Sequence, residues 1–357
     1  MMQKTLTILV LLLTAFRLPS CKNTQVEVVD LDPLVQKALY DTTSSYYTDF
    51  STYPKNIADL PIGVFELGNT KTYALDCALG LDCFDNITGG ESSDFIRDFA
   101  GENFIFYTAL SDADSIYDAN GALDIHDAAI KHTLFLVGDK CAEGEKERAK
   151  IVIAAGNITR DGGLSDIRTM LDASGSGVKV LGVVEEGVKG LLDALDRSPI
   201  INYSVGMIAD SVTISSGAYQ QTLKDVMAER GLKSNLPLVC QPVDMADSLS
   251  VKQLSAALAT MIETHYAAGK PNPICALVAD FPVSDDQKAA FQDVINNYRS
   301  KRINGDYPYR SAINDRLIFI NPSECAAKEC YRVLRADNNL ALRIGETLVT
   351  HYTDLPM

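Results

Sequence analysis

The sequence predicts an α/β protein with two mostly parallel sheets flanked by helices. Short apolar runs alternate along the chain with segments whose apolar residues recur every three or four positions. The chain has 357 residues, which is enough for two ordinary domains. Helices that connect successive strands favour parallel pairing, so we expect two similar domains, each with one sheet covered by helices.

The apolar runs place the expected strands in two series. The first series is at 73–84, 103–107, 149–155 and 178–184, and the second is at 204–209, 236–239, 274–279 and 317–320. Helices are expected at 34–40, 218–230, 251–268 and 285–298. We therefore assign 71–200, with a C-terminal return over 318–357, to the first domain and 201–317 to the second. Residues 22–70 are polar and are expected to form a tether and a peripheral segment.

The first 21 residues have the pattern of a bacterial lipoprotein signal. Lys4 precedes an apolar run over 6–16 that is too short to span a bilayer. The run leads into Leu18-Pro19-Ser20-Cys21, which resembles a lipobox, so Cys21 is the expected lipidation site. Several acyl chains on one cysteine would anchor the protein firmly. We expect an exported protein, anchored at the periplasmic face of the outer membrane.

Composition limits the partners and bound groups. The net charge of -15 opposes nucleic-acid binding and attraction to an anionic membrane surface, so the membrane is expected to be reached through the lipid anchor only. The chain has eight cysteines, and the seven that follow Cys21 cannot all pair within one chain. The four histidines are scattered and no cysteine–histidine cluster has metal-ligand spacing, so no metal site is expected.

Polar loops follow most of the expected strands. In open parallel sheets, ligands bind beyond the carboxyl ends of the strands. The loops at 84–90, 155–159, 182–187, 210–219 and 280–282 are rich in Gly, Ser, Thr, Asn and Asp. Backbone N–H groups ahead of helices suit a carboxylate ligand. Each loop alone is typical of a capped turn, but five together indicate a binding site.

The order of these loops resembles the cofactor-independent aspartate/glutamate racemase family, glutamate racemase most closely. The family reads Phe-Asp-Ser-Gly-x-Gly-Gly, Ile-Ala-Cys-Asn-Thr, Val-Gly-Val-Ile-Gly-Thr followed by Ser-Gly-x-Tyr, and Cys-Thr-His-Tyr-Pro. The chain has Phe84-Asp85-Asn86-Ile87-Thr88-Gly89-Gly90, Ile153-Ala154-Ala155-Gly156-Asn157-Ile158, Val205-Gly206-Met207-Ile208-Ala209 with Ser216-Gly217-Ala218-Tyr219, and Val278-Ala279-Asp280-Phe281-Pro282. The resemblance covers about 75–327.

The resemblance implies two α/β domains with a site in the cleft between them, and no cofactor. In the family, two thiols flank the substrate α-carbon and move its proton. Here the two cysteine positions are Gly156 and Val278, which carry no proton, and the family's histidine corresponds to Asp280. The expected ligand-binding residues are Asp85, Asn86, Gly156, Asn157, Thr213, Ser216 and Tyr219.

Three functions remain open at this stage. The first is a racemase-like lipoprotein that binds an amino acid or small dicarboxylate without cysteine-dependent racemisation. The second is a periplasmic solute-binding protein. The third is an active isomerase or lyase with Asp85 and Asp280 as an acid/base pair. Cys275 lies three residues before Val278, so it is expected on the opposite strand face as a buried core thiol.

Overall fold

The computed structural model describes residues 31–67, 72–108, 125–195, 202–233, 235–244, 249–269, 272–341 and 344–353. The predicted signal segment and Cys21 lie outside the described residues. Both sheets belong to one unit, Asp32–Met357. Among the described residues, no helix is long and apolar enough to cross a membrane.

The first sheet has five strands in the order β11-β2-β1-β5-β6, and all of its strand pairs are parallel. Its strands are β1 (Ile62–Glu66), β2 (Phe104–Tyr107), β5 (Ile151–Ala155), β6 (Lys179–Gly182) and β11 (Val349–Tyr352). Every residue of β1, β2 and β5 is buried, which explains why these strands are continuous apolar runs rather than alternating ones. The end of the chain returns to this sheet, because β11 pairs with β2.

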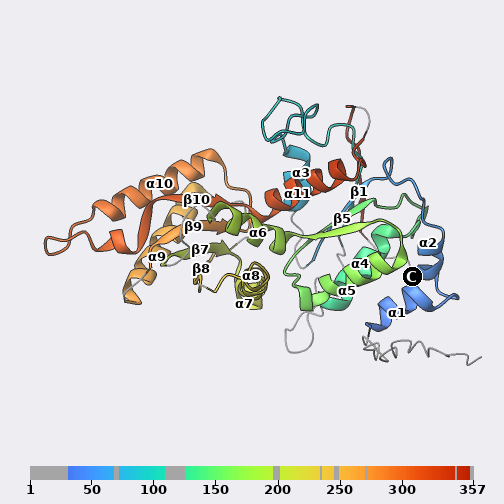
Figure 1. The fold of residues 1–357 in the computed structure, drawn as a ribbon. Coiled ribbons are helices and arrows are strands. Elements are labelled where there is room, and N and C mark those ends of the chain that lie inside the picture. Colours follow the sequence, from blue (N-terminus) through green and yellow to red (C-terminus); the bar gives the residue numbers. More distant parts are fainter. Residues whose placement is uncertain are drawn as a thin grey trace, which may run out of the picture. The chain divides into compact units, whose positions relative to one another are not determined.

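Helices cover both faces of this sheet (Figure 1). On one face, α3 and α11 bury Leu75 and Leu334 in the same core as Val64. On the other face, His132 of α4 makes edge contacts with the rings of Phe65 and Tyr107. The elements of this half are α1 (Pro33–Tyr40), α2 (Ser45–Ser51), α3 (Tyr73–Gly80), α4 (Ile125–Val137), the hairpin β3 (Lys140–Cys141) and β4 (Gly144–Glu145), a π-helical turn (Arg160–Leu164), α5 (Ser165–Ser174) and α11 (Pro322–Ala336).

The second sheet has four parallel strands in the order β10-β9-β7-β8. These are β7 (Ser204–Ala209), β8 (Leu238–Pro242), β9 (Ile274–Ala279) and β10 (Ile313–Ile320). One face packs against α6 (Val183–Leu195) and α8 (Ala218–Glu229), which follows the short α7 (Ser211–Ser216). The other face packs against α9 (Val251–Ala267), α10 (Asp285–Ser300) and the 3-10 turn Pro308–Ser311. The predicted α/β class with two mostly parallel sheets is confirmed.

Helices α6 and α11 lie against each other in the middle of the view in Figure 1. A Cβ on Gly190 would lie 2.6 Å from Sγ of Cys325, so a glycine is needed for this close approach. The α6 helix also packs on the second sheet, whereas α11 packs on the first. The pair therefore links the two cores.

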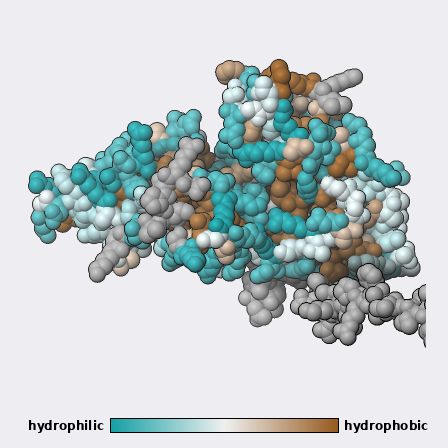
Figure 2. All heavy atoms as spheres, in the orientation of Figure 1, coloured by the Kyte–Doolittle hydropathy of each residue, from teal (hydrophilic) through white to brown (hydrophobic). Residues whose placement is uncertain are grey.

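The face visible in Figure 2 is mostly hydrophilic, with apolar patches over the first sheet.

Two predictions about the start of the first domain are wrong. The predicted strand at 73–84 is the helix α3, whose buried residues Ala74, Leu75 and Ala78 have helical spacing. The first strand is instead Ile62–Glu66, inside the segment 22–70 that was predicted to be peripheral, and it pairs with β2 and β5 in the middle of the sheet. The expected strands at 204–209 and 274–279, and the helix starts at 218, 251 and 285, agree with the structure.

Candidate functional site

Three carboxylates lie at the carboxyl ends of parallel strands. Glu66 is the last residue of β1, and Asp210 and Asp280 directly follow β7 and β9. The start of α3 adjoins the second of these sheets, because Tyr73 packs against the core that contains Ala279. Strand ends from both sheets therefore meet near α3, where a ligand site is expected in parallel sheets.

Asp280 is held by the helices that follow β7. The hydroxyl of Tyr219, on α8, donates a 2.7 Å hydrogen bond to Oδ1 of Asp280. Burial raises the pKa of Asp280 to about 6, against the lowering effect of the Tyr219 bond. Asp210 caps α7, accepting bonds of 2.7 Å from the Thr213 amide and 3.0 Å from its hydroxyl. The negative charge of Asp210 further raises the pKa of Asp280.

Glu66 is the most unusual group of the site. Its side chain is buried, with 7% of the residue exposed, and among the described residues Oε2 has no hydrogen-bond partner. Burial raises the pKa of Glu66 to about 9, and the charges of Asp280 and Asp76 contribute to the same shift. At neutral pH, Glu66 is therefore protonated while Asp280 is largely ionised. One carboxylic acid and one carboxylate in neighbouring positions are the arrangement that acid/base sites use.

The two positions that the sequence resemblance assigned to the family's thiols, Gly156 and Val278, leave little room for another side chain. Gly156, after β5, has a φ of +111°, and a Cβ there would lie 2.9 Å from the backbone oxygen of Leu67. Val278 is 3% exposed and belongs to the core of the second sheet. Burial raises the pKa of Cys77 to about 12 and that of Cys325 to about 11. These two thiols near the site are therefore protonated and poor bases at neutral pH.

Some predicted site residues are not brought to this place. Asp85 accepts bonds from the amides of Ile87 and Thr88 in its own loop, and a contribution of Arg335 also keeps the pKa of its carboxyl low. Asn86 donates to the backbone oxygens of Ile96 and Arg97. Asp85 lies in the loop after α3 rather than after a strand, and no contact between its side chain and Asp280 is seen among the described residues.

The other predicted site residues lie in different parts of the structure. Thr213 and Tyr219 lie at the Asp210–Asp280 end of the site. Ser216 donates to the Thr213 backbone oxygen and accepts from the Ala218 amide, so its hydroxyl joins α7 to α8. Gly156 and Asn157 lie in the half-buried turn after β5.

Glu66, Tyr73 and Asp76 were not predicted as site residues from the sequence. A usable signal exists, because 62–66 is a short run with four apolar or glycine residues that ends in a carboxylate. Phe65-Glu66-Leu67-Gly68 also has the order of the Phe-Asp-x-Gly pattern that was assigned to Phe84-Asp85, with glutamate in place of aspartate.

Cys275 differs from its prediction in one respect. The register between β7 and β9 shifts between Ser204, opposite Ile274, and Val205, opposite Ala276, which leaves Cys275 in a bulge. As a result, Cys275 and Val278 belong to the same core rather than to opposite faces. Its thiol donates to the backbone oxygen of Ser204 at the opposite end of β9 from Asp280, so it remains a buried core thiol as expected.

Fold and site together define a two-sheet α/β protein with carboxylates at the carboxyl ends of its parallel strands. No protein-family model and no curated protein sequence matches the chain. Among solved structures, it is similar to glutamate racemase of Francisella tularensis in complex with D-glutamate, with 18% identity, a TM-score of 0.46, and coverage of 84% of this chain and 90% of that one.

Two further solved structures are similar over most of the chain. Glutamate racemase of Thermus thermophilus, in complex with beta-chloro-D-alanine, has 18% identity, a TM-score of 0.47, and coverage of 82% of this chain and 87% of that one. An aspartate racemase homologue of Pyrococcus horikoshii has 12% identity, a TM-score of 0.40, and coverage of 77% and 99%.

Proposed function

We propose that this protein binds a small amine-bearing molecule, an amino acid first of all, at Glu66 and Asp280, and does not racemise it through thiols. The observation that carries this proposal is the buried Oε2 of Glu66, which has no hydrogen-bond partner among the described residues. Leaving a buried polar group unsatisfied costs about 1–3 kcal/mol. The N–H groups of a bound ammonium would satisfy it and would favour ionisation of both carboxyls.

The charge of the site favours an amine over a dicarboxylate that lacks one. The charged groups that influence Glu66 are Asp280 and Asp76, and the one that influences Asp280 is Asp210. All of these are carboxylates. A second negative charge from a dicarboxylate would be repelled, whereas an ammonium would be attracted. Of the ligands expected from the sequence, the amino acid is therefore the better candidate.

The side chains around the site support the proposed absence of thiol chemistry. A two-base mechanism needs one thiolate and one thiol, and removing one proton carrier costs orders of magnitude in rate. Gly156 and Val278 carry no proton, and the raised pKa values of Cys77 and Cys325 leave too little thiolate to replace them.

The test measures the melting temperature with three sets of compounds: amino acids, dicarboxylates without an amine, and amines without a carboxylate. We expect a concentration-dependent rise with amino acids and little effect of dicarboxylates. Glu66→Gln and Asp280→Asn should abolish the rise. Asp85→Asn is the matched control and should retain it, because the Asp85 side chain accepts hydrogen bonds from the amides of its own loop. Stabilisation by dicarboxylates alone, or an unchanged response in both site variants, would contradict the proposal.

A second candidate is acid/base catalysis by Glu66 and Asp280, in place of the Asp85–Asp280 pair. It is favoured by the pKa values of about 9 and about 6, which lie on either side of neutrality. In heavy water, a working isomerase would introduce deuterium at the α-carbon of its substrate, and Asp280→Asn would abolish the exchange. Ligand binding without any exchange would exclude this catalysis and would favour a binding protein, such as one of the solute-binding type.

We also propose that Cys21 is lipidated and that the protein is held at the periplasmic face of the outer membrane. The support is the apolar run over 6–16 followed by Leu18-Pro19-Ser20-Cys21. Labelled palmitate supplied to a bacterial host should enter the wild-type protein but not Cys21→Ser. Equal labelling of both would contradict lipidation at this residue, and cell fractionation would test the membrane assigned.

A further inference from the structure

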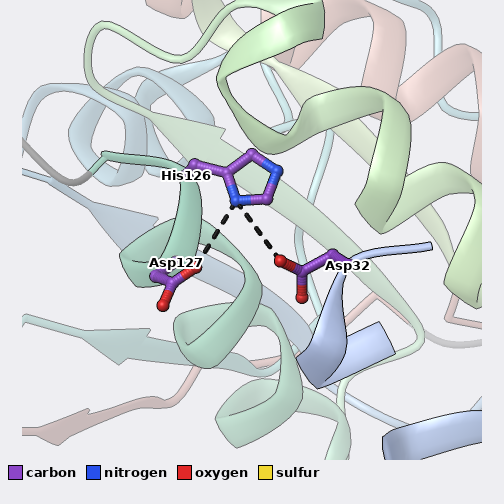
Figure 3. Close-up of side chains that lie close together, drawn as sticks. All are labelled: Asp32, His126 and Asp127. Carbon is purple, nitrogen blue, oxygen red and sulfur yellow. Dashed lines mark hydrogen bonds and ion pairs between the residues drawn. The ribbon is translucent and has the colours of Figure 1, made fainter. Parts of the chain in front are cut away.

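His126, near the start of α4, faces carboxylates from three helical elements. Its Nδ1 lies 3.7 Å from Oδ2 of Asp32, the cap of α1, and 3.5 Å from Oδ1 of Asp127. Its Nε2 lies 2.7 Å from Oδ2 of Asp166 on α5. Figure 3 shows the Asp32 and Asp127 side chains on the same side of the ring, both next to one ring nitrogen.

We propose that Asp32, His126 and Asp127 form a binding site for a divalent transition-metal cation of the zinc type, with Asp166 as the residue that positions the imidazole. The three ligand atoms lie within 4.8 Å of one another. A tetrahedral ion with bonds of about 2.1 Å keeps its ligand atoms about 3.4 Å apart. The separations of 3.5 and 3.7 Å around Nδ1 are close to that value, so little movement is needed.

The contact with Asp166 determines which nitrogen is available. A carboxylate only accepts, so the 2.7 Å contact places a proton on Nε2 of His126. In the neutral imidazole, the lone pair of Nδ1 then faces two carboxylate oxygens, which is unfavourable unless positive charge lies between them. Metal-binding histidines commonly donate their other N–H to a carboxylate in this way.

The cap of α1 fixes the second ligand. Oδ1 of Asp32 accepts bonds of 2.7 Å from the Leu34 amide and 3.3 Å from the Val35 amide. The carboxylate is thereby held with Oδ2 toward His126. Its side chain is 10% exposed, whereas that of Asp127 is 43% exposed, so solvent can complete the coordination of an ion from the Asp127 side.

The ligand set favours zinc-type ions over calcium or magnesium. Imidazole nitrogen suits zinc and its neighbours, whereas calcium takes six to eight oxygen ligands and magnesium keeps several waters. Two carboxylates also balance the charge of a divalent ion. Because the ligands come from α1 and α4, and Asp166 from α5, a bound ion would fasten the N-terminal helix to the first sheet's helical layer. No metal site was expected from the sequence, because Asp32 is far from His126 and Asp127 in the chain.

The test uses the purified full chain after treatment with a chelator. Saturable binding of cobalt, seen as visible absorption bands of nitrogen and oxygen coordination, and a rise in melting temperature with zinc are expected. His126→Gln should abolish both, and Asp166→Asn should weaken affinity about 10- to 100-fold. His265→Gln is the matched control and should bind normally, because the Nε2 of His265 contacts a backbone oxygen, that of Asn272.

Three outcomes would overturn the proposal: no saturable binding, binding unchanged in His126→Gln, or thiolate charge-transfer bands that place the ion on cysteines. Should His126→Gln fail to fold, Asp127→Asn replaces it as the decisive variant. Its side chain is 43% exposed, so loss of cobalt binding there reports on coordination rather than on packing.

Discussion

The hydroxyl of Tyr219 and the carboxylate of Asp280 lie 2.7 Å apart, and this bond joins α8 to the end of β9. Tyr219 is 2% exposed, so its hydroxyl has little access to water if the bond is lost. The bond therefore stabilises the folded protein and also holds the Asp280 carboxylate in a fixed direction beside Glu66.

Replacing Tyr219 with phenylalanine should destabilise the protein and change the titration of Asp280. A buried carboxyl that loses its donor costs about 1–3 kcal/mol of unfolding free energy. The pKa of Asp280 should rise above its value of about 6, because the Tyr219 bond lowers it. Urea unfolding and NMR titration of the carboxyl measure the two effects. Tyr298→Phe is the control, since its hydroxyl bonds Glu263 at the surface and its loss should have a smaller effect.

Glu66→Gln should remove a pH dependence of stability. The pKa of Glu66 is raised from 4.5 in the unfolded chain to about 9 in the folded protein. The folded protein therefore keeps a proton that the unfolded chain releases, so this contribution is fully present below pH 4.5 and is lost as the pH rises toward 9.

The loss amounts to at most about 1.4 kcal/mol per pH unit. Urea denaturation of wild type and Glu66→Gln from pH 5 to pH 9 measures this slope. The unfolding free energy of wild type should fall relative to that of the variant as the pH rises. Asp285→Asn, whose side chain is 99% exposed, is expected to show no such trend. If the unfolding free energies of wild type and Glu66→Gln changed with pH in parallel, Glu66 would be ionised in the folded protein.

The predictions from the sequence succeeded where the strands are continuous apolar runs with polar ends. β7 and β9 are of this kind, which is why their bounds were predicted correctly and why Asp280 and Thr213 were expected just after them. Glu66 was missed because its short strand lies within a polar stretch, where periodicity gives little signal. Asp85 was expected to follow a strand, but a Phe-Asp sequence followed by glycines also forms a capped turn outside any strand.

The buried ion pair between Lys150 and Glu102 should be essential for the C-terminal return. Nζ of Lys150 lies 2.6 Å from Oε2 of Glu102, and the two side chains are 0% and 3% exposed. The same ammonium donates to the backbone oxygen of Asn339, and Glu102 accepts from the Ala341 amide. Lys150→Met leaves a buried, unpaired carboxylate and should cost about 3–5 kcal/mol of unfolding free energy.

Thermal or urea unfolding of Lys150→Met measures this cost. The matched control is Lys179→Met, because the Lys179–Asp337 pair is exposed, with side chains 51% and 35% accessible, and should change stability by less than about 1 kcal/mol. Equal effects of the two variants would show that the Lys150 pair adds no more than a surface pair does.

Gly156→Cys should not confer racemase activity and should destabilise the protein. The φ of +111° is unfavourable for any residue with a Cβ, and that Cβ would meet the Leu67 oxygen at 2.9 Å. Strain of this kind costs about 1–3 kcal/mol. The turn after β5 is thus shaped for a glycine, and a thiol would require the Leu67 backbone to move. Unfolding free energy and α-proton exchange of glutamate and aspartate in heavy water are the two measurements. A Gly156→Cys variant as stable as wild type that exchanged the α-proton at enzymatic rates would show that the turn after β5 accepts a reactive thiol at this position.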